Sequence, residues 1–229
     1  MRAARVYLIR HGQAGLRARY DTLSDLGREQ AARLRAWFAA EGITLDRAIS
    51  GPLERQVETA RVAASDPEIE PRLAEFDLDA VYRGIAPLLA RDDDDFARGY
   101  EALQAAVASP HAKEHRQWTV TDVGVFRAWY EGRYEFDGES WADFKARALA
   151  ARDLVAGIAP GSNVAIFTSA TPVGLWLAGV LGADDERAMK LAGSCYNASV
   201  TTLRIDGDEL RLLGYNSIGH LEPSLRTFR

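Results

Sequence analysis

The chain has 229 residues, and its Lys and Arg total of 28 against an Asp and Glu total of 33 gives a formal net charge of −5. Hydrophobic residues make up 47% and charged residues 27%, which is ordinary for a globular domain and excludes a disordered or fibrous chain. The mild acidity argues against a general nucleic-acid binder. Apolar runs such as Val6–Ile9 fall far short of the ~20 residues that span a bilayer. We therefore expect one globular domain with neither nucleic acid nor membrane as a partner.

Two features of the sequence bear on the compartment. Arg2 and Arg5 are not followed by an apolar stretch, so we expect no secretory signal. The single cysteine, Cys195, has no partner for an internal disulfide, which fits a reducing compartment. We expect a cytoplasmic protein in which Cys195 is a small buried residue rather than a nucleophile.

The first third of the chain alternates predicted strands and helices. Ala4–Ile9 and Ile43–Ile49 are short apolar runs typical of buried strands. A helix is expected between them, with Ser24 as its N-cap and Gly42 just past its end. Its buried face should be formed by apolar residues at helical spacing: Ala31, Leu34 and Phe38.

A second helix is expected after Ser50-Gly51-Pro52, because proline suits the first helical position. Its buried face should consist of the apolar positions Leu53, Val57, Ala60 and Ala64. The resulting order of strand, helix, strand and helix predicts a parallel sheet that is covered by helices.

The middle of the chain, residues 78–135, contains two or three predicted helices and no convincing buried strand. We interpret Asp92–Asp95 as a solvated helix start or exposed loop rather than a metal site. His111 and His115 have the spacing of a metal pair on a helix, but a solvated helix start is favoured. Most aromatic residues here should pack, and one or two could line a substrate pocket: Trp118, Trp129, Tyr130 and Trp141.

The last third returns to the α/β pattern. Ser140 is the expected N-cap of a helix, and Asn163–Thr168 is a predicted strand. Thr171 followed by Pro172 indicates a cap and first turn, and the helix should end at Gly182. Asp206-Gly207-Asp208 is a hairpin signal that joins two predicted strands, Ala198–Ile205 and Glu209–Tyr215.

Polar groups follow three of the predicted strands. Arg10 and His11 come directly after the first strand, and Arg55 lies in the first turn of the helix after the second. Thr168–Pro172 begins a helix directly after the third. Because the carboxyl ends of parallel strands face one crevice, we expect these groups to lie together. Two guanidinium groups, an imidazole and a helix N-terminus predict a phosphate pocket.

Several runs resemble the signature segments of one family: Ile9-Arg10-His11-Gly12-Gln13, Leu23–Ala31, Ser50–Ala60, Leu73–Glu75, Gly138–Ser140 and Asn216–Leu221. On them the chain resembles the histidine phosphatase superfamily, the phosphoglycerate mutase-like branch with the Arg-His-Gly motif. The resemblance covers most of the chain outside residues 83–136. It implies a three-layer α/β/α sandwich with a mostly parallel sheet, built as a single domain over residues 1–229. A helical insertion at about residues 82–136 would cap the site.

The resemblance implies roles for individual residues. His11 would be the nucleophile that forms a phosphohistidine, and no metal or other cofactor is expected. Arg10, Arg55 and Gln13 would bind the phosphoryl group, the arginines through charged forked hydrogen bonds. Glu75 would protonate the leaving oxygen and then help to activate water. Nearby acids could substitute for Glu75: Asp77, Asp79 and Glu139.

The sequence departs from the family at Ser169, where the resemblance leads us to expect a second histidine. Serine donates a hydrogen bond but carries no charge, and losing one preorganised donor typically costs about 10²–10³ in rate. One compensation would be the N–H groups of the helix that begins near Pro172, with Ala170 as a contact. Another would be His220, reaching in from the C-terminal segment; the alternative is a structural histidine near the sheet edge.

The leading hypothesis is a metal-independent phosphomonoesterase that acts on a small-molecule phosphate ester or a phosphoprotein. Ser169 motivates the alternative of a catalytically weak or inactive family member that binds a phosphorylated ligand. A phosphomutase ranks lowest, because repeated transfer demands an intact site. Exposed hydrophobic residues in the insertion could support a homodimer.

Overall fold

The computed structural model describes residues 3–15, 21–108, 119–207 and 209–228. It divides into two compact units. The first consists of Met1–Glu75 together with Arg147–Arg229, and the second is Phe76–Ala146. The sheet and the site residues belong to the first unit, which we call the sheet unit; the second is called the helical unit.

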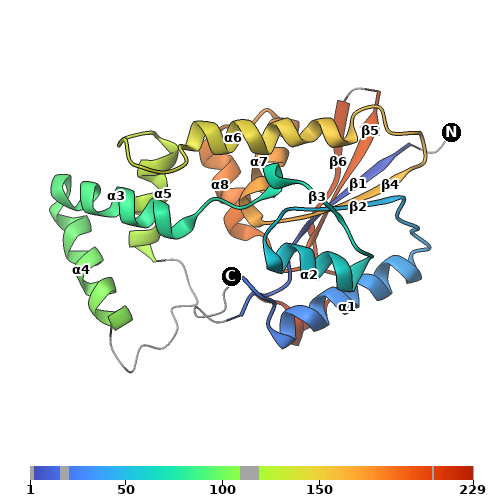
Figure 1. Ribbon diagram of the computed structural model, residues 1–229, viewed down its shortest axis with the longest axis horizontal. Helices are drawn as coiled ribbons and strands as arrows, with labels where there is room; N and C mark the ends of the chain where they lie inside the picture. Colours follow the sequence, from blue (N-terminus) through green and yellow to red (C-terminus); the bar gives the residue numbers. More distant parts are fainter. Residues whose placement is uncertain (1–2, 16–20, 109–118, 208, 229) are drawn as a thin grey trace. The chain divides into compact units, whose positions relative to one another are not determined.

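The sheet unit is built on six strands in the order β3-β2-β4-β1-β5-β6 (Figure 1). Their bounds are Arg5–Arg10 for β1, Arg47–Ser50 for β2, Glu68–Ile69 for β3, Asn163–Thr168 for β4, Val200–Asp206 for β5 and Glu209–Ser217 for β6. Neighbours from β3 to β1 pair in parallel, whereas β5 pairs antiparallel with both β1 and β6. The predicted mostly parallel sheet is therefore confirmed.

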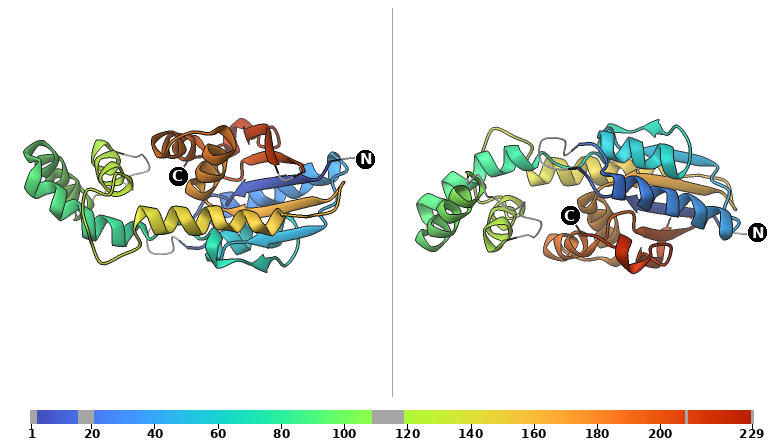
Figure 2. Two further views of the ribbon diagram at one scale, coloured as in Figure 1. Left: turned by 90° about the horizontal axis from the view of Figure 1, so that it is seen from above. Right: turned by 90° about the horizontal axis from the view of Figure 1, so that it is seen from below.

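Helices cover both faces of this sheet (Figure 2). On one side lie α1 (Asp25–Ala40) and α2 (Glu54–Ala63), and on the other α7 (Ala170–Leu181), with α8 (Asp185–Ser194) packed against α7. Successive side chains of β1 point to opposite faces of the sheet and pack in both helical layers. Val6 and Leu8 pack with Trp176 of α7. Tyr7 and Ile9 pack instead with the helix on the opposite face, at Leu34 and Phe38. The three-layer α/β/α sandwich is confirmed.

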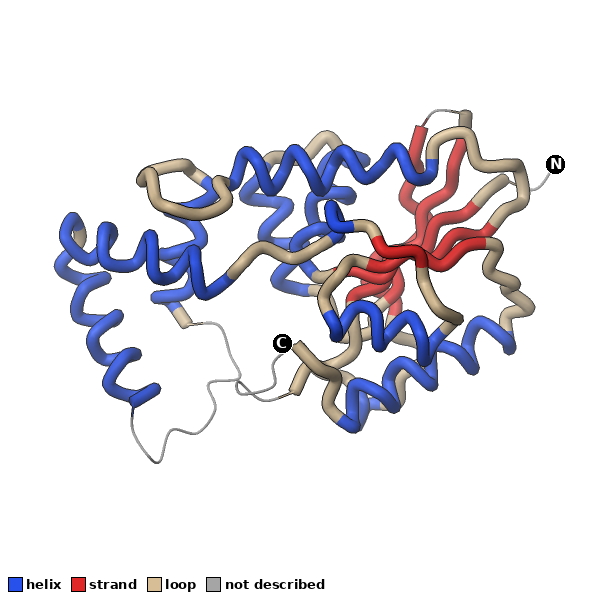
Figure 3. Tube along the Cα trace, viewed as in Figure 1, coloured by secondary structure: helices blue, strands red, loops and turns tan. Residues whose placement is uncertain are grey.

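The described part of the helical unit contains helices and no strand (Figure 3). They are α3 (Leu78–Asp92), α4 (Asp94–Ala108), α5 (Val120–Tyr130) and the start of α6 (Trp141–Ala150). Aromatic rings form the core: the Trp129 ring centroid lies 4.5 Å from that of Phe76 and 5.2 Å from that of Trp141. The predicted packing of Trp129 and Trp141 is confirmed. That this unit caps the site stays a prediction.

Several other predictions in the middle of the chain can be compared with the structure. The acidic run ends α3 and begins α4, its side chains are exposed, and Asp93 caps α4 by accepting from the Phe96 amide at 2.9 Å. Tyr130 is half-buried, with its ring 6.1 Å from that of Trp141. His111, His115 and Trp118 lie outside the described residues.

Most helix ends follow their predicted signals. The Ser24 side chain accepts from the Gly27 amide at the start of α1. Gly42 and Gly182, which follow α1 and α7, have φ angles of 62° and 63°. These left-handed conformations suit glycine because it has no Cβ.

Two predictions about helices are wrong, and one helix was not predicted. The N-cap of α7 is Ser169 rather than Thr171, so the helix begins two residues earlier. The N-cap of α2 is Leu53, and Pro52 lies before the helix instead of in its first turn. Helix α8 was not predicted, because its apolar stripe is short and buries only Ala188 and Ala192.

Candidate active site

The end of β1 places His11 at the carboxyl edge of the parallel strands. His11 is 3% exposed. Its amide donates to the Thr168 carbonyl at 2.9 Å, and its carbonyl accepts from the Ala198 amide at 3.1 Å. Its Nδ1 lies 2.7 Å from the Gly12 carbonyl oxygen. Since a carbonyl can only accept, Nδ1 carries the proton and Nε2 keeps its lone pair.

The turn after His11 is packed tightly against neighbouring helices. A Cβ atom on Gly12 would lie 2.5 Å from the Gly27 carbonyl oxygen in α1, so only glycine fits. The Gly12 amide donates to Thr59 Oγ1 of α2 at 3.0 Å, and that hydroxyl donates to the Arg55 carbonyl at 2.6 Å. The loop that follows His11 is therefore packed against α1 and hydrogen-bonded to α2.

Arg55, in the first turn of α2, turns its guanidinium toward the imidazole. Its Nε donates to His11 Nε2 at 3.3 Å. Its Nη1 lies 2.8 Å from Asp21 Oδ1, and the other oxygen of that carboxylate accepts from the Glu54 amide at 3.2 Å. Asp21 thus joins the guanidinium to the start of the helix that carries it.

Arg10 is buried on the same strand end and donates from Nη1 to the Cys195 carbonyl. The pKa of His11 is well below its usual value, because burial disfavours the charged ring, and the Arg55 and Arg10 guanidiniums repel it, in that order of size. The bond to the Gly12 carbonyl acts in the opposite direction. His11 is therefore a neutral imidazole at neutral pH.

Glu75 lies at the N-terminus of α7. Its Oε2 accepts from the Thr171 amide at 3.1 Å, which holds the carboxyl group beside the first turn of α7. Burial raises the pKa of the Cys195 thiol; the Glu75 carboxylate adds to this rise, and the Arg10 guanidinium opposes it. Glu75 and Arg10 thus act in opposite directions on the pKa of the same thiol.

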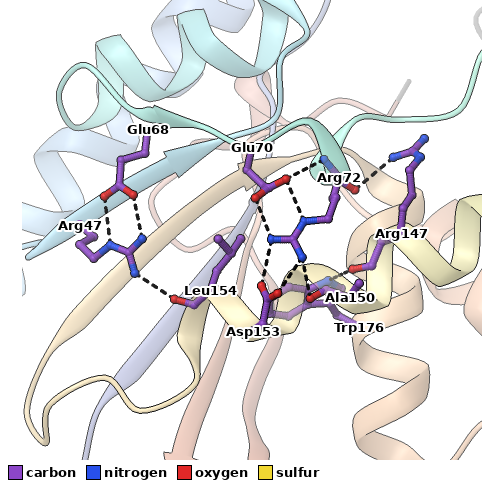
Figure 4. Close-up of polar contacts among 10 residues, drawn as sticks. Arg47, Glu68, Glu70, Arg72, Arg147, Ala150, Asp153, Leu154 and Trp176 are labelled. Carbon is purple, nitrogen blue, oxygen red and sulfur yellow. Dashed lines mark hydrogen bonds and ion pairs between the residues drawn. The ribbon is translucent and has the colours of Figure 1, made fainter.

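The segment before Glu75 is held by a network of arginines in the sheet unit (Figure 4). Arg72 lies 2.8 Å from Glu70 Oε2 and 2.8 Å from Asp153 Oδ2. Arg147 Nη1 donates to the Ala74 carbonyl at 2.8 Å. The backbone directly before Glu75 is thus held by a hydrogen bond from a charged side chain.

Ser169 stands between β4 and α7 and is 1% exposed. Its Oγ accepts from Gln56 Nε2 at 2.8 Å. At the N-terminus of α7 the Thr171 amide is used by Glu75, and Pro172 has no N–H. Among the first three helical residues, and considering partners within the described chain, the Ala170 amide is the donor left for an anion.

Gln13 and His220 have partners away from the imidazole. Gln13 Oε1 accepts from Ser24 Oγ at 3.0 Å. His220 Nε2 lies 3.0 Å from the Ala198 carbonyl oxygen, and its ring lies 6.0 Å from the Trp37 ring of α1. Burial lowers the pKa of His220. These contacts match the structural alternative for His220 rather than a compensation at the phosphate pocket.

Sequence analysis missed Asp21, Gln56 and Thr59. The apolar spacing in α2 selected a different face, whereas the helix buries Arg55, Gln56, Thr59, Ala60 and Ala63. A signal was present: if Arg55 faces the site, Thr59, four residues later, must share that face of the helix. Asp21 has no such signal, because its pairing with Arg55 spans 34 residues.

Within the part of the chain that the structure describes, no group of three or more His, Cys, Asp or Glu side chains is arranged to hold a metal ion. In the same residues, no helix combines the length and the apolar character needed to cross a membrane.

The fold and the site define an α/β protein with a buried neutral imidazole between two guanidinium groups. The chain belongs to the histidine phosphatase superfamily (branch 1), whose family model matches residues 6–117 and 100–218. The resemblance seen in the sequence motifs is therefore confirmed. A search of curated proteins finds no match.

Solved structures share the fold at low sequence identity. Bacillus stearothermophilus YhfR is 20% identical with a TM-score of 0.66, over 96% of this chain and 100% of that one. The mycobacterial glucosyl-3-phosphoglycerate phosphatase is 23% identical with a TM-score of 0.62, over 95% and 100%. The alpha-ribazole phosphatase of Shigella flexneri is 19% identical with a TM-score of 0.58, over 93% and 96%.

Proposed function

We propose that this protein is a metal-independent phosphomonoesterase that works through a phosphohistidine on His11. The observation that carries the proposal is the state of this imidazole: Nδ1 is bound to the Gly12 carbonyl, and Nε2 faces Arg55 at 3.3 Å. Its lowered pKa keeps the ring neutral. A neutral imidazole with a directed lone pair is a nucleophile that needs no separate base.

The proposed reaction has two steps. His11 Nε2 attacks phosphorus, the N–P bond forms and the ester P–O bond breaks, while Glu75 gives a proton to the leaving oxygen. Water, deprotonated by Glu75, then attacks the phosphohistidine, and inorganic phosphate and neutral His11 are released. Arg10 and Arg55 stabilise the phosphoryl oxygens, and for this the Arg55 Nε–H exchanges the imidazole for a phosphoryl oxygen.

Family membership and the names of the structural neighbours support a small-molecule substrate. Those neighbours include an alpha-ribazole phosphatase, a glucosyl-3-phosphoglycerate phosphatase and a phosphoserine phosphatase of Entamoeba histolytica. We propose a small phosphate monoester as the substrate class and the cytoplasm as the location, with a phosphoprotein as the alternative substrate.

The test is phosphate release from an aryl phosphate and a panel of biological phosphomonoesters. Wild type and His11→Ala are compared with no added metal and with a chelator. We expect release by the wild type that is unchanged by chelator and absent from the variant. Equal release by both proteins would exclude His11 as the nucleophile.

The role of Glu75 has its own test, because a general acid matters most when the leaving group is poor. Glu75→Gln should reduce turnover of an alkyl phosphate by about 10²–10³-fold, and should affect an aryl phosphate with a good leaving group much less. Equal losses on both substrates would show that Glu75 does not protonate the leaving oxygen.

A specific observation favours a second candidate function, a weak or inactive member that binds a phosphorylated ligand. Ser169 supplies no charge where the family resemblance predicts a histidine, and it is 1% exposed. Saturable binding of phosphomonoesters without turnover across the panel would support this candidate. A phosphomutase ranks below both and would be detected by direct interconversion of phosphate isomers.

A further inference from the structure

The orientation of one buried amide determines how Ser169 can act. Gln56 is 0% exposed. Its Oε1 accepts from the Leu53 amide at 3.2 Å, and its Nε2 donates to the Leu73 carbonyl at 3.2 Å. An amide oxygen can only accept and an amide nitrogen can only donate, so these two backbone partners exclude the flipped orientation.

The remaining Nε2 hydrogen is directed at Ser169 Oγ, 2.8 Å away. Ser169 must therefore be the acceptor in this bond, and its own hydroxyl proton points elsewhere. The Leu73 carbonyl oxygen already accepts two hydrogen bonds, because the Thr168 hydroxyl also donates to it at 2.7 Å. Within the described residues, the Ser169 hydroxyl donates to no group.

We propose that Gln56 is a positioning residue: by donating to Ser169 Oγ, it aims the Ser169 hydroxyl at the phosphoryl group that His11 attacks. Gln56 and Ser169 together then supply the hydrogen-bond donor that the histidine expected at position 169 would supply. This inference rests on the proposed phosphomonoesterase function. The hydroxyl is neutral, so the pair replaces the donor of a histidine but not its positive charge.

The side chains of Gln56 and Ser169 are also closely packed. A Cβ atom on Gly51 would lie 2.1 Å from Gln56 Oε1, so the amide fills its space completely. Ser169 is 1% exposed and its Oγ lies 2.8 Å from the same amide, so we expect a histidine ring at position 169 to compete with Gln56 for space. The identities of residues 56 and 169 should then be coupled by volume as well as by hydrogen bonding.

The first experiment is a double-mutant cycle on kcat with Ser169→Ala and Gln56→Met, which keeps the volume of residue 56 and removes its donor. Ser169→Ala should lower kcat by about 10²-fold, and Gln56→Met alone by about 10-fold, as expected for one neutral hydrogen bond. In the Ser169→Ala background, Gln56→Met should have no further effect. An equal loss in both backgrounds would overturn the positioning role.

Gln30→Met is the matched control, because Gln30 is also a fully buried glutamine, its amide donates to the Leu225 carbonyl at 2.7 Å, and the substitution again keeps the volume. Its thermal unfolding shift should resemble that of a Gln56 variant, but its effect on kcat should be the same with and without Ser169→Ala. A Gln30 cycle as strongly coupled as the Gln56 cycle would overturn the assignment.

The second experiment tests the shared volume. Ser169→His alone should lower kcat at least about 10-fold and lower Tm, because overpacking a core strains it. Adding Gln56→Ala should restore Tm and raise kcat to at least the wild-type value. Equal activity of the single and double variants would show that the two positions do not share space.

These outcomes are separable from a failure of the proposed function. If the wild type releases phosphate and His11→Ala does not, the phosphomonoesterase proposal holds whatever the cycle shows. A cycle without coupling would then remove the Gln56 proposal alone. A wild type without turnover would remove both, because the hydroxyl would have no reaction to serve.

Discussion

Helices α1 and α2 cover the same face of the sheet but bury different kinds of side chain. Besides Gly27 and Gln30, α1 buries Ala31, Leu34 and Phe38. By contrast, α2 buries Arg55, Gln56 and Thr59 beside two alanines. Burying polar groups costs free energy unless they are hydrogen-bonded, and each of these three has a partner at the site. One helix therefore stabilises the fold, whereas the first turns of the other build the site.

The largest expected effect is at Arg55. Arg55→Ala removes the guanidinium nearest the imidazole, and kcat should fall by about 10³-fold or more, within the range found for arginines that stabilise phosphoryl transfer. Arg61→Ala on the same helix is the control, since that side chain is 63% exposed and pairs with Asp66. A loss of similar size in both variants would break the contrast between the two faces of α2.

A smaller, complementary effect is expected from α1. Leu34 is completely buried against β1, and Leu34→Ala should lower the free energy of unfolding by about 2–5 kcal/mol. Well below its Tm, the variant should keep the wild-type kcat because Leu34 packs in the apolar cluster with Tyr7 and Phe38. Urea unfolding measures the stability and steady-state kinetics on the same samples measure kcat. A normal stability with a reduced kcat would contradict the conclusion that α1 stabilises the fold and α2 builds the site.

The smallest expected effect is a displaced titration of His11. Its pKa is lowered by burial, Arg55 and Arg10, so its NMR titration midpoint should lie below the usual ~6.5. Arg55→Gln removes the second of these causes and should move the midpoint upward. A wild-type midpoint at or above the usual value would contradict the neutral nucleophile.

The lowered pKa of His11 also determines how the free energy of unfolding depends on pH. Because the folded pKa of His11 is below the unfolded value of ~6.5, the unfolded chain takes up a proton first as the pH falls. This contribution to stability is therefore complete above the unfolded pKa and is lost as the pH falls toward the folded pKa. Urea unfolding of the wild type and of His11→Ala at neutral and mildly acidic pH should show the variant losing less stability.

Sequence patterns were sufficient to predict the elements whose buried positions are apolar. The run Asn163–Thr168 was predicted with the bounds of β4, and the buried face of α1 was predicted correctly. The face of α2 was not, because its buried positions are polar and a hydrophobic pattern cannot select them. The two-residue strand β3 is too short and too exposed to leave a pattern.

The candidate site also has residues that the sequence predicted and contacts that it did not. Arg10, His11 and Arg55 follow from polar residues next to strand ends, whereas Glu75 was expected only from the family resemblance; in the structure Arg55 contacts His11, and Glu75 lies at the start of α7. The contacts that orient them come from distant parts of the chain: Arg10 meets the Cys195 carbonyl 185 residues away, and Gln56 meets Ser169 across 113 residues. Such contacts depend on the folded arrangement and leave no trace in local spacing.

The central claim, a covalent phosphohistidine on His11, is tested most directly by trapping it. Wild type and His11→Ala are mixed with a radiolabelled phosphomonoester that the wild type turns over, quenched rapidly in alkali and digested. The account predicts label on the peptide that contains His11, stable in alkali and lost in acid as expected for an N–P bond, and no label on the variant. Label on another residue, or an acid-stable bond, would contradict it.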